Sequence, residues 1–341
     1  MVRSRIGRAP LLALTLLVAT GLVACSDDGE ATTATSTTAE GTRSSPPSTE
    51  PASDGCGRSR VPPGVSERTM TSEGVERRFQ LTVPEGYDGT TPLPVVLGLH
   101  ALTVSHQVVA NMIGFADMAE RYEFIGVAPS GRLDGTTPYW LAAPAPDNYD
   151  ITFIDELLDR LEADLCVDPS RVFATGMSNG GQMSSLLACR LPDRFAAVAP
   201  VAGVEFYESC EDGPVPVIAF HGRADPIVTY EGGGLNATRI ADVQYWKGDV
   251  PGGLPEHEGV DVALATWARH NGCDTTFAEE QVSPSVRRRT WPGCEAETVL
   301  YVVDGGGHAW PGKPVPQFED AFGPGTTEID GSSLIFEFFL G

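Results

Sequence analysis

The stretch Val172-Phe173-Ala174-Thr175-Gly176-Met177-Ser178-Asn179-Gly180 places a serine between a short buried strand and a helix. The apolar run 172–175 predicts the strand, and the small residues from Gly180 to Arg190 predict the helix. The turn fits G-x-S-x-G, in which the glycines leave room for a sharp bend that pushes the hydroxyl outward. It also points a helix N-terminus at any developing negative charge. We therefore predict that Ser178 is a nucleophile, with a glycine-rich turn around a bystander serine as the alternative.

A serine hydroxyl needs a base, and the base needs a group that orients it. His308 lies in Gly305-Gly306-Gly307-His308-Ala309-Trp310-Pro311-Gly312, directly after a predicted strand at 298–303. Asp225 lies in the loop after the predicted buried strand 215–220, between the serine and the histidine in chain order. The order Ser, Asp, His is that of α/β-hydrolases and differs from those of chymotrypsin and subtilisin. The alternatives are a surface-loop histidine and an aspartate that only shapes an Asp-Pro turn.

Outward from this centre, buried apolar runs alternate with amphipathic stretches. The pattern predicts an α/β fold of the α/β-hydrolase type, with a mainly parallel central sheet and helices on both faces. Glycines, scattered charges and Tyr245-Trp246 make 231–259 a predicted surface excursion near the site. The remaining predicted elements are strands at 78–83, 94–99, 124–128 and 196–201, and helices at 107–121, 151–165, 262–270 and 333–340.

Two backbone N–H groups are expected to bind the oxyanion that forms during attack on a carbonyl. In this fold one comes from the residue after the nucleophile, here Asn179, and one from the loop after the strand 94–99. That loop begins at His100, and we assign Leu102 as its donor. We expect His100 to hold the loop and not to act as a second base.

The first 24 residues predict a signal peptide, because a start with three arginines precedes an apolar run at 11–23. Leu22-Val23-Ala24-Cys25 resembles the lipobox of bacterial lipoproteins, which implies cleavage before Cys25 and a lipid on its thiol. A plain secretory signal with a chance cysteine is the alternative. Residues 25–55 are rich in Ser, Thr and Pro and predict a flexible tether. Residues 56–341 are expected to form the catalytic domain.

Composition restricts the partners. The formal net charge of −23 argues against nucleic acid and against anionic lipid surfaces. Of the 7 cysteines, 6 remain when Cys25 is set aside, and none is in a CxxC pair. In an oxidising compartment these are expected to form disulfides, and 6 cysteines allow 15 pairings. They are Cys56, Cys166, Cys189, Cys210, Cys273 and Cys294. The chemistry predicts neither a metal nor an organic cofactor.

From about Cys56 to the C-terminus, the chain resembles the polyhydroxybutyrate depolymerase and feruloyl esterase group of secreted α/β-hydrolases. The resemblance implies a triad of Ser178, Asp225 and His308, a disulfide between Cys273 and Cys294, and a Trp310 that faces the substrate. The family usually has His-Gly where this chain has His100-Ala101, and the stretch after Trp140 lacks the usual cysteine pair. The matching stretches are 81–87, 167–172, 176–181, 221–228, 267–273 and 306–312.

The expected function is that of an exported serine esterase, secreted or held by the Cys25 lipid at the outer face of the cell membrane. The resemblance implies carboxylic esters of feruloyl, hydroxyalkanoate or acetyl type, either small or polymeric, as substrates. One alternative is an acyltransferase on the same scaffold, which would pass the acyl group to a sugar. Another is a non-catalytic lipoprotein that binds a ligand.

Overall fold

The computed structural model describes residues 52–134, 137–210, 213–234 and 256–341. The predicted signal peptide, Cys25 and most of the tether lie outside the described residues, as does most of the excursion that carries Tyr245-Trp246. Gly233–Gly234 (β10) and Glu256–His257 (β11), at the two described ends of that excursion, pair as a small antiparallel sheet.

The centre of the fold is a sheet in the order β1-β2-β4-β3-β7-β8-β9-β14-β13-β12. From β4 to β14 all neighbouring strands run parallel, and the antiparallel pairs lie at the two edges. The strands are β1 (Gly64–Ser72), β2 (Val75–Val83), β3 (Leu93–Leu99), β4 (Ile125–Pro129), β7 (Val167–Met177), β8 (Ala197–Val201), β9 (Val217–Gly222), β12 (Ala278–Ser283), β13 (Val286–Trp291) and β14 (Thr298–Val303).

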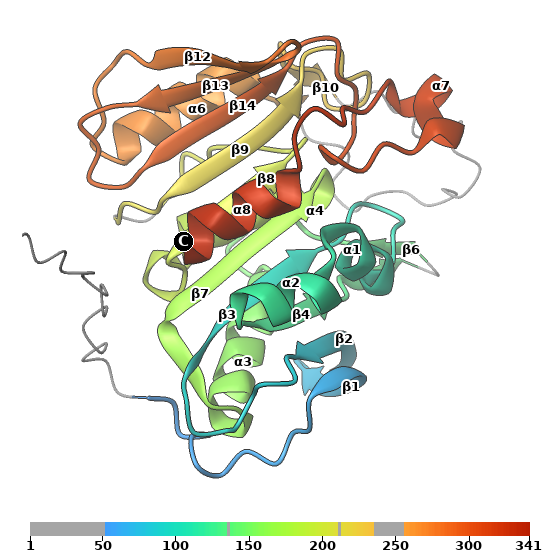
Figure 1. The fold of residues 1–341 in the computed structure, drawn as a ribbon, viewed down its shortest axis with the longest axis vertical. Helices are drawn as coiled ribbons and strands as arrows, with labels where there is room; N and C mark the ends of the chain where they lie inside the picture. The colour runs from blue at the N-terminus through green and yellow to red at the C-terminus, as the bar shows by residue number, and fades with distance from the viewer. Residues whose placement is uncertain (1–51, 135–136, 211–212, 235–255) are drawn as a thin grey trace, which may run out of the picture. The chain divides into compact units, whose positions relative to one another are not determined.

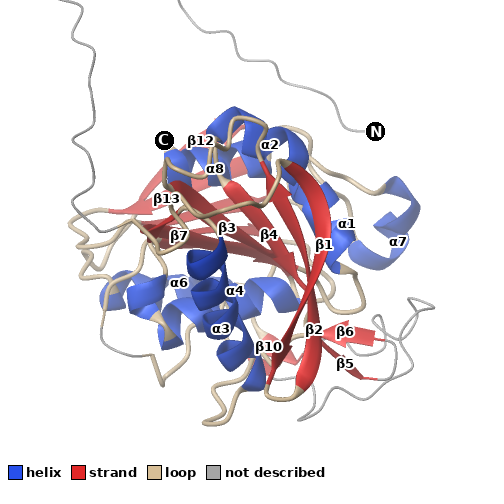
Figure 2. Cartoon of the chain, turned by 90° about the horizontal axis from the view of Figure 1, so that it is seen from below, coloured by secondary structure: helices blue, strands red, loops and turns tan. Residues whose placement is uncertain are grey.

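Helices cover both faces of this sheet, as predicted (Figure 2). The apolar residues of the inner strands are buried on both faces, which is typical of parallel strands between helical layers. One layer consists of α1 (His106–Ile113), α2 (Phe115–Tyr122) and α8 (Gly331–Leu340), and the other of α3 (Tyr149–Asp164), α4 (Asn179–Arg190) and α6 (Val260–His270). Outside these layers lie the hairpin β5 (Arg132–Asp134) and β6 (Thr137–Tyr139) and the short helix α7 (Glu319–Phe322).

The single helix predicted over 107–121 is wrong, because Gly114 divides it. This glycine has φ 83°, a left-handed conformation that ends α1 and lets α2 start in a new direction. The break lowers Phe115 onto the sheet, where its ring lies against two glycines. A Cβ atom on Gly98 would be 2.8 Å from this ring, and one on Gly126 would be 3.0 Å from it.

The packed domain begins before residue 56, so the predicted end of the tether is corrected. Ser53 is buried; its Oγ donates to Leu165 O (2.7 Å) and accepts from Val167 N (3.0 Å). Gly55 N donates to Glu162 O at 2.9 Å. A short polar segment can therefore join the fold by satisfying backbone groups where α3 ends and β7 begins.

The structure contains three disulfides, which establish the cysteine pairing that the sequence did not determine. Cys273–Cys294 is confirmed, and the other bonds are Cys56–Cys166 and Cys189–Cys210. Disulfides persist in oxidising compartments, so these bonds agree with export. Among the helices of the described ranges, none has the length and apolar character needed to span a bilayer.

Candidate active site

Each of the three predicted catalytic residues follows a parallel strand of the sheet, and these strands have their carboxyl ends on the same side of the molecule (Figure 1). Ser178 follows β7, Asp225 follows β9 and His308 follows β14. Strand register links the ends, since Met177 pairs with Val201 of β8, which in turn pairs with Phe220 of β9. In open α/β sheets, binding sites form beyond the carboxyl ends of the parallel strands, where these residues lie.

Ser178 occupies a strained turn between β7 and α4. Its backbone has φ 57° and ψ −121°, which is rare for a residue other than glycine, and its N–H donates to Val201 O at 2.8 Å. The glycines packed around this turn have no room for a side chain. A Cβ atom on Gly180 would lie 2.2 Å from Leu99 O, and a Cβ atom on Gly203 would lie 2.2 Å from Ser178 O. Backbone strain of this kind is found at nucleophile elbows and persists only where the surroundings enforce it.

Asp225 and His308 form a buried hydrogen-bonded pair. His308 Nδ1 lies 2.7 Å from Asp225 Oδ2, and side-chain exposure is 5% for the imidazole and 0% for the carboxylate. Asp225 Oδ1 accepts from the N–H groups of Ile227 (2.8 Å) and Val228 (2.9 Å). The carboxylate therefore accepts the Nδ1 proton and leaves Nε2 as the basic nitrogen of His308.

Burial alone would raise the pKa of Asp225. The charge and hydrogen bond of His308, together with His221, outweigh that effect and hold the pKa well below its usual range. Asp225 is therefore ionised at neutral pH and can stabilise an imidazolium at His308.

The predicted oxyanion donors lie in the two expected segments. Asn179 is the first residue of α4, where backbone N–H groups lack partners within the helix. Leu102 lies in the loop after β3. The two residues that follow it, Thr103 and Val104, donate their N–H groups to Pro138 O and Ala101 O respectively, at 3.1 Å each. Among the described residues, neither Leu102 N–H nor Asn179 N–H donates to an acceptor.

The side chain of Asn179 is fixed by the backbone of Trp140. Its Oδ1 accepts from Trp140 N (2.8 Å), and its Nδ2 donates to Trp140 O (3.1 Å). The next residue, Leu141, donates its N–H to the buried Asp150 (2.8 Å), which forms an ion pair with the buried Arg77. This chain of contacts connects the start of α4 to the core through the 140–148 loop.

His100 has a structural position, in agreement with the sequence prediction. Its Nδ1 donates to Ala101 O (2.8 Å), its Nε2 accepts from Gly131 N (2.9 Å), and its ring stacks on Trp140 at 4.9 Å. Burial lowers the pKa of this imidazole to about 4. Because both ring nitrogens are engaged, His100 cannot accept a proton from Ser178.

The prediction that Trp310 faces the substrate is wrong. Trp310 is 1% exposed, and its Nε1 donates to Ser332 Oγ at 3.1 Å. The indole packs in the core layer that contains α8, including Ile335 and Phe336. Trp310 therefore supports the His308 loop from inside the domain.

A buried acid that was not predicted from the sequence lies beside the first turn of α4. Glu205 is 8% exposed, and its Oε1 accepts from Gln182 Nε2 at 3.4 Å. Burial raises the pKa of this carboxyl to about 8, with a further contribution from Glu258. The available sequence signal is an acid close behind a fully apolar strand, at Val201-Ala202-Gly203-Val204-Glu205.

Glu205→Gln should make the protein relatively more stable as the pH rises. The folded-state pKa of Glu205 is raised, so the stability that its proton contributes is complete below about pH 4.5 and lost as pH rises through about 8. A neutral amide has no such dependence. Denaturant unfolding from pH 5 to 9 should show the free-energy difference moving in favour of the variant by up to about 4 kcal/mol. The exposed Glu295→Gln is the control and should follow the wild-type profile; a parallel profile for Glu205→Gln would contradict the assignment.

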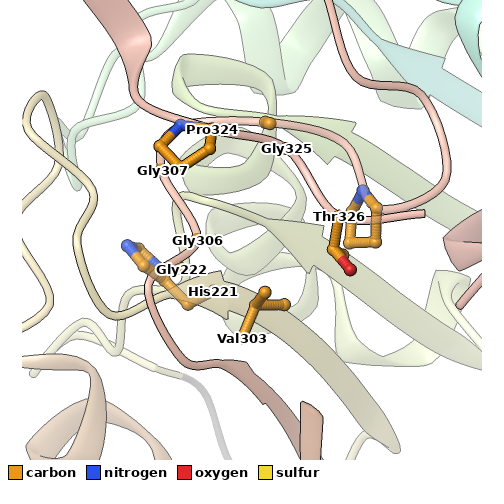
Figure 3. Close-up of a pocket in the computed structure, with 10 residues that line it drawn as sticks. His221, Gly222, Val303, Gly306, Gly307, Pro324, Gly325 and Thr326 are labelled. Carbon is orange, nitrogen blue, oxygen red and sulfur yellow. The ribbon is translucent and has the colours of Figure 1, made fainter. Parts of the chain in front are cut away.

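A small pocket adjoins the loop that carries His308 (Figure 3). His221 and Gly222 of β9 form one wall, and Gly306 and Gly307 form another. Pro324, Gly325 and Thr326 close it from the segment before α8. Within the described ranges, no group of three or more His, Cys, Asp or Glu side chains could hold a metal ion.

Comparisons with known proteins agree with this architecture. The sequence model of a family described as "Putative esterase" matches residues 71–206. Probable feruloyl esterase C of Aspergillus niger is 29% identical over 258 residues, which cover 72% of this chain and 82% of that protein. Putative esterase NocK of Nocardia uniformis subsp. tsuyamanensis is 30% identical over 253 residues, which cover 67% of this chain and 71% of that protein.

Among solved structures, acetyl xylan esterase from Aspergillus awamori superposes with a TM-score of 0.52 at 16% identity. The match covers 71% of this chain and 94% of the esterase, and it supports the α/β-hydrolase fold. The relatives of similar sequence show that this chain belongs to the feruloyl esterase-like family of carboxylic ester hydrolases.

Proposed function

We propose that the protein hydrolyses carboxylic esters through an acyl-enzyme on Ser178. The observation that carries the proposal is the buried Asp225–His308 pair. Like the strained turn of Ser178, this pair follows the carboxyl ends of parallel strands. A histidine held in this tautomer is the base that a serine nucleophile requires.

The proposed reaction begins when His308 Nε2 takes the Ser178 proton as Oγ bonds to the ester carbonyl carbon. The carbonyl oxygen becomes an oxyanion, for which the N–H groups of Leu102 and Asn179 are the proposed donors. Each such donor contributes about 3 kcal/mol of transition-state stabilisation in measured cases. The carbon–oxygen bond to the alcohol then breaks, and His308 returns the proton to the leaving oxygen. Water, deprotonated by His308, releases the acid and restores Ser178.

For the acyl group we propose a feruloyl-type ester. The support is the name of a relative that matches most of this chain, probable feruloyl esterase C of Aspergillus niger. Hydroxyalkanoate and acetyl esters are the other substrate types that the sequence indicates. Rates with methyl ferulate, methyl 3-hydroxybutyrate and p-nitrophenyl acetate decide among them, and a preference for either of the last two would overturn the feruloyl assignment.

We further propose that the protein is exported and attached to the outer face of the cell membrane through a lipid on Cys25. The lipobox-like Leu22-Val23-Ala24-Cys25 supports the anchor, and the three disulfides support export. Mass spectrometry of the mature N-terminus tests this, because an unmodified thiol at Cys25 would exclude the anchor.

The nucleophile is tested by labelling the purified protein with a fluorophosphonate. We expect one adduct, located on the tryptic peptide that contains Ser178, because only a serine activated by a base attacks the reagent at a useful rate. Protein unfolded in urea is the control and should not react. A folded protein that fails to react, or that is labelled at another serine, would refute the proposed mechanism.

A further inference from the structure

Asp225 is contacted by a second histidine, which the proposed reaction does not use. His221 lies in β9, and its side chain is fully buried. Its Nε2 lies 2.8 Å from Val228 O and 3.4 Å from Asp225 Oδ2. Since a carbonyl oxygen only accepts, Nε2 carries the proton and donates it to Val228 O, with Asp225 Oδ2 as the second oxygen near this N–H group.

The other ring nitrogen of His221, Nδ1, is buried and has no hydrogen-bond partner among the described residues, so a second proton there would have no acceptor. His257 is nearby: its Nδ1 lies 3.0 Å from Glu258 O, its Nε2 is likewise unpaired among these residues, and burial lowers its pKa. The ring of Tyr230 packs edge-on against His221 at 5.9 Å. His221 therefore has one N–H group, at Nε2, between Val228 O and Asp225, and its ring lies near two other titratable side chains.

We propose that His221 is a positioning residue that orients Asp225 Oδ2 toward the imidazole of His308. This inference rests on the proposed function, because it assumes that Asp225 and His308 assist Ser178. Among the described residues, Oδ1 of Asp225 is held by two backbone N–H groups, whereas Oδ2 bonds to His308 Nδ1 and lies 3.4 Å from Nε2 of His221. An N–H group at this distance limits the positions that Oδ2 can take beside the imidazole of His308.

The position of His221 in the fold agrees with this role. It lines the same pocket as Gly306 and Gly307, which lead to His308, so its backbone and the His308 loop are neighbours (Figure 3). If His221 served only to satisfy Val228 O, its loss would change stability and leave the pH dependence of catalysis unaffected. If it orients Asp225, its loss would concentrate negative charge on Oδ2 and raise the pKa of the attached imidazolium.

The test compares His221→Leu, which removes the donor, with His221→Gln, which retains an N–H group at similar reach. With p-nitrophenyl acetate, the leucine variant should lose about 10-fold in kcat with little change in KM. Its acid limb of kcat/KM should also move to higher pH by roughly half a unit or more. Glutamine should restore most of both. Should the leucine variant not fold, His221→Asn replaces it, because that side chain ends short of Asp225.

His270→Gln is the matched control, since His270 Nε2 also bonds a backbone carbonyl, Gly213 O at 3.0 Å, but does not contact Asp225. It should keep the wild-type pH profile. A folded donor-less variant with wild-type kcat and acid limb would overturn the inference, as would a glutamine variant that behaves like leucine. Failure of the proposed function gives a different result, namely wild-type protein whose Ser178 does not react with fluorophosphonate.

Discussion

Ser178→Ala should lower kcat for p-nitrophenyl acetate on the order of 10⁵-fold or more, while the protein stays folded. The substitution removes the atom that bonds to the acyl carbon, and the strained backbone of the turn does not depend on the hydroxyl, because no side-chain cap bond is made there. Steady-state kinetics and thermal unfolding of the same preparation measure the two effects separately. Any residual rate would come from binding and oxyanion stabilisation without covalent catalysis.

The matched control for this experiment is Ser184→Ala, on the same helix. Ser184 is buried, and its Oγ donates to Gly181 O at 2.8 Å, so its loss tests the effect of removing a hydroxyl from α4. We expect a small loss of stability and nearly unchanged kcat. If Ser178→Ala kept even a tenth of the wild-type rate, another nucleophile would have to be sought.

Asp225→Asn should lower kcat on the order of 10⁴-fold, the second-largest effect that we expect. An amide at this position can donate to His308 Nδ1, which would move the imidazole proton to Nε2 and leave no base facing Ser178. The loss should appear in kcat more than in KM, because substrate contacts are not altered. The variant should still fold, because a carboxylate oxygen and an amide NH₂ group differ little in volume.

Kinetics between pH 6 and 9 measure this effect. Asp304→Asn provides the comparison. Asp304 directly follows β14, forms an ion pair with Arg287 and is 43% exposed. Exposed pairs contribute at most about 1 kcal/mol, so this control should retain full activity. A loss of less than 10-fold in Asp225→Asn would show that the carboxylate does not orient the base.

The inner part of the fold could be predicted because burial leaves a clear pattern in the sequence. Strands covered on both faces are short apolar runs, and β3, β4, β8 and β14 all follow that rule. The candidate triad was found from chain order together with the ends of these strands. The Asp225–His308 contact then agrees with that order.

The edges of the sheet escaped prediction for the opposite reason. β12 is almost entirely exposed, and β13 has the run Arg287-Arg288-Arg289 in place of an apolar stretch, with apolar residues only at its two ends. Cross-strand ion pairs hold them together, such as Arg289 Nε to Glu279 Oε2 at 2.6 Å. Such pairs depend on strand register, which hydrophobic periodicity does not reveal.

Two residues near the site required tertiary contacts to be understood. Trp310 and Glu205 lie in loops after strands, where sequence alone cannot tell an inward side chain from an outward one. The structure buries both, the indole against α8 and the carboxyl against α4. The two differences are opposite in kind, because a core side chain was predicted to contact substrate and a buried acid beside α4 was not predicted.

The attachment of Ser53 determines where the leading segment enters the domain. Ser53 and the Cys56–Cys166 disulfide fasten the leading segment to the start of β7, whereas Ser178 follows the other end of the same strand. Eleven residues of strand separate these ends by roughly 30 Å. The leading segment therefore enters the domain at the end of β7 opposite Ser178. If the proposed lipid on Cys25 is present, this point of entry leaves the carboxyl ends of the parallel strands free for a polymeric ester.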